Sequence, residues 1–179
     1  MSNRVVMAFF GDQESRAAVQ RLAPAADVIA VAFDLGGGES LDVLRDVAID
    51  AGATRCHALD VREEFAREAL LPALRARVFA EPSEAFAAMA GEFVAEKLRQ
   101  IAVMENATVW RSGAVVCGPK SVTPAPVAPQ RLAIAFSDGV PIAVNGIAMT
   151  LPELMDSVET ITGESALTVL QREYALAVA

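Results

Sequence analysis

The sequence predicts an α/β protein with a doubly wound parallel sheet, followed by a small C-terminal β-hairpin and two helices. In the first two thirds of the chain, short apolar runs alternate with amphipathic segments, which is the pattern of right-handed βαβ crossovers. The pattern changes class after a proline-rich stretch. We therefore expect a first domain over residues 1–117, a linker over 118–130 and a C-terminal region over 131–179.

Four apolar runs are typical of strands. Val5–Phe10 and Asp27–Asp34 are continuous and rich in β-branched residues, as in strands that are buried on both faces. Thr54–Leu59, which is shorter than Asp27–Asp34, is predicted as a third strand, and Ala107–Ser112 is predicted as a fourth. The intervening segments carry apolar residues at steps of three and four, which predicts helices over Glu14–Leu22, Glu39–Ala51, Val61–Ala80 and Ser83–Glu105.

The C-terminal region begins after Gly118–Gln130, where four prolines indicate an extended linker. Leu132–Phe136 and Val140–Val144 flank Ser137-Asp138-Gly139, a turn sequence that predicts a hairpin, and Asn145-Gly146 is a second tight turn. Two helices are predicted after it, over Leu151–Thr162 and Glu164–Val178. The apolar arc of the last helix must pack either on its own domain or on a second subunit. We expect the second, a homodimer through this region.

The hydropathy, the net charge and the few cysteines and histidines argue against several classes of function. Although 54% of the residues are hydrophobic, no window approaches the roughly 18 apolar residues of a membrane span, so we expect no membrane partner. The net charge of −8 argues against binding nucleic acid through its phosphates. Two separated cysteines and one histidine predict neither a disulfide framework nor a transition-metal site. The N-terminal residues lack the apolar region of a secretory signal, and we expect a cytoplasmic protein.

The first strand runs into Gly11-Asp12 and then into a helix. In an open α/β sheet this turn lies at the carboxyl edge, where such folds bind ligands. The alternatives for Gly11–Arg16 are a degraded phosphate site that still holds an anion and a turn of structural importance only. For Gly36–Gly38 the structural interpretation is preferred, and His57 is expected to be a partly buried or edge residue without a catalytic role.

With these elements in place, the chain resembles argininosuccinate synthase, a member of the N-type ATP-pyrophosphatase superfamily. Residues 34–39, DLGGGE, are similar to the family's DLGQGE, and residues 61–65, VREEF, with the later PAL of residues 72–74, are similar to its LREEF and PAL. Residues 136–146, FSDGVPIAVNG, resemble its hairpin FEKGVPVALNG. The similarity runs from Val5 to Gly113 and resumes at Arg131, so this chain resembles a shortened form of the family.

The resemblance implies a five-stranded, HUP-type nucleotide domain of the adenine-nucleotide alpha-hydrolase-like kind and a remnant of a second domain. It implies ATP or AMP as the cofactor and carbon–nitrogen ligation in arginine biosynthesis as the family's activity. The positions that would contact the nucleotide are Ala8, Phe9, Gly11, Ser15, Arg16, Phe33 and Gly113. A small-molecule nucleotide or amino acid is the corresponding ligand.

The chain departs from the family at its ligand loops. Where the family has SGGLDTS, this chain has Phe10 to Arg16, FGDQESR, so a ring and the carboxylate of Asp12 replace small residues beside the phosphates. Where the family has AHGCTGKGNDQ, residues 111–121 are RSGAVVCGPKS, and Val115, Pro119 and Lys120 stand in place of substrate-binding residues. Phe33 replaces a small residue beside the adenine. No aromatic residue in Ala80–Ser83 matches the family's substrate-contacting tyrosine.

Two hypotheses follow. In the first, the chain is a pseudoenzyme that has lost ligase activity, has no catalytic residues, and acts by binding a nucleotide, a metabolite or a protein partner. In the second, it is an ATP-dependent ligase with altered substrates that uses Glu14, Ser15 and Arg16. A purely structural scaffold is a third alternative. We expect the first, because the replaced loop residues are those that would have to be placed with sub-ångström accuracy for catalysis.

Overall fold

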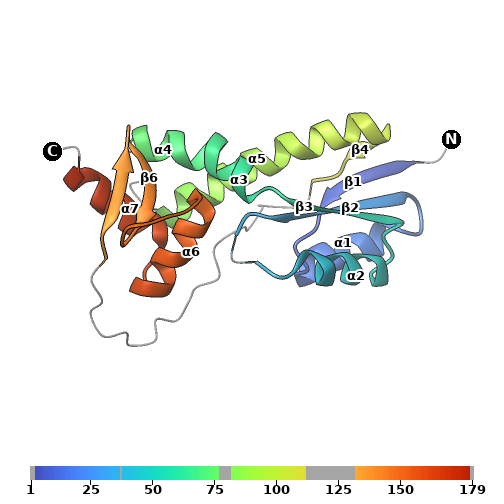
Figure 1. Cartoon of the computed structure of the whole chain (residues 1–179). Coiled ribbons are helices and arrows are strands. Elements are labelled where there is room, and N and C mark those ends of the chain that lie inside the picture. Colours follow the sequence, from blue (N-terminus) through green and yellow to red (C-terminus); the bar gives the residue numbers. More distant parts are fainter. Residues whose placement is uncertain (1–2, 37, 77–81, 112–131, 178–179) are drawn as a thin grey trace. The chain divides into compact units, whose positions relative to one another are not determined.

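A computed structural model describes residues 3–36, 38–76, 82–111 and 132–177 of the chain (Figure 1). The chain divides into two compact units. The first comprises Met1–Val61 and Ala87–Cys117, and the second comprises Arg62–Phe86 and Gly118–Ala179. Residues 62–86 thus group with the C-terminal segment, whereas the boundary drawn from the sequence placed them in the first domain.

The first unit is built on a parallel sheet. Its strands are β1 (Arg4–Ala8), β2 (Asp27–Asp34), β3 (Arg55–Asp60) and β4 (Thr108–Val109), in the order β3-β2-β1-β4. The central strand β2 is buried from Val28 to Phe33, as its continuous apolar run predicts. Among the described residues this sheet has four strands, whereas the resemblance implies five. The linker segment and Gly113 lie outside the described residues.

Helices cover both faces of this sheet, which confirms the predicted fold class. Figure 1 shows α1 (Gln13–Leu22) and α2 (Leu41–Asp50) on one side and α5 (Pro82–Glu105) on the other. The core beneath α1 and α2 is formed by Met7, Phe9, Ala18, Val19, Val28, Ala30, Ala32, Leu44, Ala48 and Ala53. The order of strands and helices places the loop between β1 and α1 at the carboxyl edge of the sheet.

The second unit begins with a helical segment that is interrupted by a π-helical turn. It comprises α3 (Arg62–Phe65), the π-helical turn η1 (Ala66–Leu70) and α4 (Leu71–Ala76). The sequence predicted one continuous helix here. Pro72 has no backbone amide to donate to the carbonyl four residues earlier, and the regular hydrogen bonding is interrupted just before it. The ring of Phe65 packs edge-on against Phe86, with ring centroids 5.3 Å apart.

A small antiparallel sheet completes the second unit together with two helices. Its strands are β5 (Ile134–Ser137), β6 (Val140–Val144) and β7 (Ile147–Ala148), in that order. The two turns use Asp138-Gly139 and Asn145-Gly146, all four residues with φ between 49° and 82°, as expected for tight hairpin turns. The helix α6 (Leu151–Thr162) matches its predicted bounds and ends at Gly163, whose φ is 69°.

The last helix, α7 (Ala166–Ala177), folds back on its own unit. Leu167 and Leu170 are buried, and the ring of Tyr174 packs edge-on against Phe136, with ring centroids 5.7 Å apart. Packing of the apolar arc on its own domain, the first of the two alternatives, therefore accounts for these side chains. A homodimer through residues 131–179 stays a prediction.

Candidate functional site

The turn between β1 and α1 requires glycine at residue 11. Gly11 has a φ of +74°, a conformation that residues with a Cβ adopt at a cost. A Cβ at this position would also lie 2.6 Å from Cδ2 of Leu44 in the core. Just before the turn, the amide of Phe9 donates to the carbonyl oxygen of Val31 over 2.9 Å, which holds the end of β1 against β2. The family's one retained glycine thus keeps the geometry of the turn.

Asp12 is the N-cap of α1. Its Oδ1 accepts a hydrogen bond of 2.6 Å from the backbone amide of Ser15. In return, the hydroxyl of Ser15 donates to the carbonyl oxygen of Asp12 over 3.2 Å. Ser15 is only 3% exposed, so this hydroxyl is enclosed by the turn. At this helix N-terminus, where a phosphate would be bound in a nucleotide site, one of the amide donors already holds a carboxylate of the chain itself.

Arg16 lies in the first turn of α1, at the surface. Its Nε donates to the carbonyl oxygen of Gly11 over 2.8 Å, and its backbone amide donates to Asp12 O over 3.1 Å. The guanidinium is therefore folded back over the turn. Glu14 is also exposed in this helical turn, so two carboxylates and one guanidinium surround the helix N-terminus.

The other predicted contact residues have different surroundings. Phe9 is fully buried in the core under α1 and α2, so its ring is used in packing. Ala8 is half-buried at the end of β1, and Phe33 is 6% exposed near the end of the neighbouring strand. Gly113 and the second ligand loop after Arg111 lie outside the described residues. The structure thus brings together Gly11, Ser15 and Arg16, and it adds Asp12, which is hydrogen-bonded to Ser15 and to the backbone amide of Arg16.

One loop contact at this edge was not predicted from the sequence. The carboxylate of Asp34, the last residue of β2, accepts a hydrogen bond of 2.9 Å from the amide of Gly36. Gly36 has a φ of +104°, and open space surrounds the position of its absent Cβ. The family-like DLGG sequence at residues 34–37 therefore begins with a turn that Asp34 closes on itself, and the signal for it was an aspartate two residues before a glycine.

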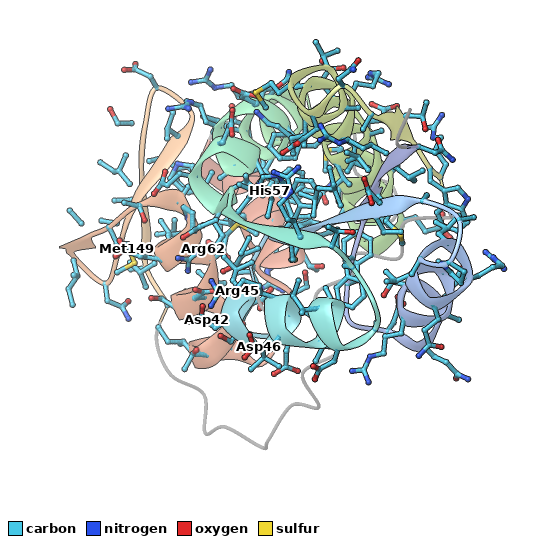
Figure 2. The ribbon with its side chains drawn as sticks, turned by 90° about the vertical axis from the view of Figure 1, so that its right-hand side faces the viewer. Asp42, Arg45, Asp46, His57, Arg62 and Met149 are labelled. Carbon is cyan, nitrogen blue, oxygen red and sulfur yellow. The ribbon has the colours of Figure 1, made fainter. Side chains whose placement is uncertain are left out.

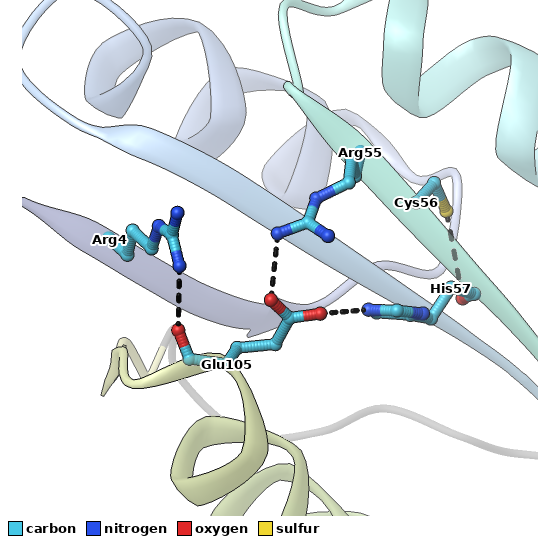
Figure 3. A network of polar contacts seen from close by, with 5 residues as sticks. All are labelled: Arg4, Arg55, Cys56, His57 and Glu105. Carbon is cyan, nitrogen blue, oxygen red and sulfur yellow. Dashed lines mark hydrogen bonds and ion pairs between the residues drawn. The ribbon is translucent and has the colours of Figure 1, made fainter. Parts of the chain in front are cut away.

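A polar cluster lies at the opposite, amino edge of the sheet (Figure 3). The carboxylate of Glu105, the last residue of α5, bonds to Arg55 Nη2 over 2.7 Å and to His57 Nε2 over 2.9 Å. Arg4 donates to the backbone oxygen of Glu105 over 3.2 Å. The hydrogen bond with His57, followed by the charge of Arg55, holds the pKa of Glu105 below its ordinary value. We call these four residues the Glu105 cluster.

His57 is an edge residue, as predicted, because β3 is the terminal strand of the sheet among the described strands, and its side chain is partly buried. The Glu105 cluster also gives His57 a partner 48 residues away in sequence, which local sequence reasoning did not identify. The Glu105 cluster lies at the opposite end of the strands from the β1–α1 turn. We therefore interpret it as a connection between α5 and the sheet.

An open hollow of about 650 Å³ lies between α2 and β3. It is lined by Arg45, Asp46, Ile49 and Asp50 of α2 and by Thr54, Arg55, Cys56 and His57. Figure 2 shows Asp42, Arg45 and Asp46 along α2. Partial burial raises the pKa of the Cys56 thiol, which keeps it protonated near neutral pH.

Within residues 3–36, 38–76, 82–111 and 132–177, the structure contains no group of three or more His, Cys, Asp or Glu side chains arranged to hold a metal ion. In the same part of the chain, no helix has both the length and the apolar character needed to cross a membrane.

The fold and the turn define the class of protein: a doubly wound α/β domain with a strand–turn–helix of the nucleotide-binding type at its carboxyl edge. Residues 4–122 match the model of the family described as "Arginosuccinate synthase N-terminal HUP domain". The chain therefore belongs to the argininosuccinate synthase family.

Curated relatives agree with this assignment. The chain is 35% identical over 111 residues to the argininosuccinate synthases of Streptococcus suis (strain 05ZYH33) and Streptococcus thermophilus (strain ATCC BAA-491 / LMD-9). It is 33% identical over 111 residues to that of Streptococcus mutans serotype c. Each match covers 62% of this chain and 28% of the relative. The matched region thus spans little more than a quarter of these relatives.

Proposed function

We propose that this protein is a non-catalytic member of the argininosuccinate synthase family that acts by binding a small metabolite or a protein partner. The observation that supports this proposal is the hydrogen bond from the amide of Ser15 to the carboxylate of Asp12. In a phosphate-binding turn this amide is a donor to the ligand, and here the chain supplies its own anion in that place.

The effect of Asp12 on phosphate affinity follows from the repulsion between two negative charges. A phosphate oxygen that approached the helix N-terminus would meet the Asp12 carboxylate at close range. Two like charges about 4 Å apart repel by about 1 kcal/mol even in bulk water, and by about 4 kcal/mol near a protein surface. The smaller figure already lowers affinity about fivefold. Arg16 offsets part of this repulsion, although its Nε is bonded to Gly11.

The residues that differ from the family pattern also support the loss of ligase activity. Phe10 is half-buried at the turn, where the family has a small hydroxyl residue. Val115, Pro119 and Lys120 replace the polar residues that hold the family's amino-acid substrates. A ligase requires its donors at accurately fixed positions around both substrates. Loss of donors in two separate loops supports the loss of ligation.

A second candidate function is an ATP-dependent carbon–nitrogen ligase with altered substrates. The observations that favour it are the retained left-handed conformation of Gly11 and the presence of Ser15 and Arg16 in the first turn of α1. In this alternative ATP would be the cofactor, bound with Arg16 turned toward the phosphates.

Calorimetry separates the two candidates. ATP, AMP and pyrophosphate are titrated into the full chain with and without Mg²⁺, and a coupled assay with ATP, citrulline and aspartate follows turnover. Our proposal expects no turnover and at most weak binding of ATP. Tight, Mg²⁺-dependent ATP binding would favour the ligase, and turnover in the coupled assay would refute the non-catalytic proposal. A cytoplasmic location stays a prediction.

A further inference from the structure

Among the described strands, β3 is the terminal strand of the parallel sheet, and its outer edge is regular. Among the described strands it is hydrogen-bonded only to β2, with consecutive residues paired in register from Arg55 to Asp60. Just past its end, the amide of Val61 donates to the carbonyl oxygen of Asp34 over 3.1 Å. Because successive residues of a strand direct their backbone groups to opposite sides, the backbone groups of Cys56 and Ala58 point away from β2.

The usual protections of an edge strand are lacking in the middle of β3. Residues 56–59, CHAL, contain no proline, lysine or carboxylate, and the register with β2 shows no bulge. A strand edge of this kind is a template for pairing with another strand. The hollow that is lined by α2 and by residues 54–57 lies beside the first part of this edge.

A stripe of exposed residues on α2 flanks the same edge. Asp42, Arg45, Asp46 and Ile49 follow one another at steps of three, one and three residues along the helix, and Arg45, Asp46 and Ile49 line the hollow. Arg45 pairs with Asp42 over 2.9 Å, with side chains 49% and 80% exposed. Ile49 is 45% exposed. The stripe therefore has a cation next to two anions and one apolar residue, and the exposed Asp50, which also lines the hollow, adds a third carboxylate beside it.

We infer that two copies of this chain pair through the outer edges of β3, antiparallel about a two-fold axis at Ala58. With the axis at Ala58, the outward-facing residues of one strand meet outward-facing residues of the other: Ala58 meets Ala58, and Cys56 meets Asp60 of the second copy. The two four-stranded sheets become one continuous sheet. The methyl groups at the axis are small enough for close approach.

Charge complementarity selects a second copy as the occupant. Antiparallel pairing of the strands brings the two α2 helices together on the same face of the joined sheet, also antiparallel. Because Arg45 has Asp42 on one side and Asp46 on the other, it then faces an aspartate of the second helix, twice over by symmetry. The Glu105 cluster lies on the opposite face of β3, since Arg55 and His57 alternate with Cys56 and Ala58, and it is left intact.

Light scattering and sedimentation of the full chain test this inference across micromolar to millimolar concentrations. We expect a monomer–dimer equilibrium. Ala58→Pro removes an outward amide while leaving the amides that bond to β2, and it should give a monomer with an unchanged circular-dichroism spectrum. Arg45→Asp replaces the cation of the stripe, leaves only acidic charges on it and should weaken dimerisation on the order of tenfold. Arg45 is at the surface, so this variant still folds even if Ala58→Pro does not.

A variant with exchanged charges on α2 tests whether the two α2 helices face each other in the dimer. The triple variant Asp42→Arg, Arg45→Asp, Asp46→Arg restores alternating signs, so it should dimerise with itself and avoid mixed dimers with the unmodified chain. Ile147→Asp, an exposed change in β7, serves as the control and should leave the dimer intact. A chain that is monomeric at every concentration would overturn the inference. A dimer that survives Ala58→Pro and Arg45→Asp, or one that only Ile147→Asp dissociates, would overturn it as well.

Discussion

The carboxylate of Asp12 accepts a hydrogen bond of 2.6 Å from the amide of Ser15, and this contact closes the N-terminus of α1. The same residue is the N-cap of the helix and the charge that a phosphate would have to approach. Asp12 should therefore stabilise the fold and lower its affinity for phosphate, which makes it the residue to vary first.

Asp12→Ala should destabilise the first unit, because it removes an N-cap whose loss typically costs about 1 kcal/mol. Denaturant unfolding measures the change. Asp12→Asn keeps an acceptor for the Ser15 amide and should recover most of the lost stability without the charge. If Asp12→Ala unfolds at the same denaturant concentration as the unmodified chain, the cap is not a stabilising contact.

Gly11→Ala should be more destabilising than Gly36→Ala. Both residues have a positive φ, which costs an alanine about 1 kcal/mol or more. Only at Gly11 would the added methyl also press on a neighbour, Cδ2 of Leu44 at 2.6 Å. Thermal unfolding of the two variants side by side gives the comparison. Equal costs would show that Leu44 moves aside freely.

Acid should weaken the Glu105 cluster. The pKa of Glu105 is lowered in the folded chain by His57 and Arg55, so its carboxylate stabilises the fold above the unfolded glutamate pKa of about 4.3. This contribution is lost as pH falls through the lower, folded pKa. The difference in unfolding free energy between the unmodified chain and Glu105→Gln should therefore shrink progressively as the pH falls below about 5.

The matched control for that experiment is Glu92→Gln, an exposed change on the same helix. Its difference from the unmodified chain should stay nearly constant over the same range. A Glu105→Gln difference that is equally flat would contradict the assigned role of the cluster.

Leu170→Ala should lower the stability of the folded chain by about 2–5 kcal/mol, because Leu170 is only 1% exposed and its truncation leaves a cavity. The loss should be the same at low and high protein concentration, since this burial occurs within one chain. A loss that depends on concentration would instead support a homodimer through residues 131–179.

Much of the fold was predictable because its signals are local. The apolar run of β2 and the periodicity of α6 predicted both elements with their observed bounds, and the turn sequences predicted the hairpin. The predictions from sequence were wrong or incomplete where a single residue interrupts a regular pattern or where the contact partner is distant in sequence. Pro72 sits within a periodic apolar pattern, and the periodicity hid the π-helical turn before it.

The candidate site was only partly predictable. Gly11, Ser15 and Arg16 were identified by their positions in the alignment with the family's SGGLDTS, of which only Gly11 is kept, and the structure brings them together. The departure at Asp12 was evident from the sequence as a charge next to a polyphosphate site. That Asp12 would bond to Ser15 depends on how the turn folds, and the partnership of His57 with Glu105 depends on where α5 ends against the sheet.

The most direct test of the account is the affinity for ATP, measured by calorimetry, of the double variant Phe10→Ser, Asp12→Gly beside the unmodified chain. Glycine is tolerated as an N-cap, and the change frees the Ser15 amide and removes one negative charge. We expect ATP affinity to rise by about fivefold or more in the double variant. Tight ATP binding by the unmodified chain, or no gain in the folded double variant, would contradict the claim that Asp12 closes this site.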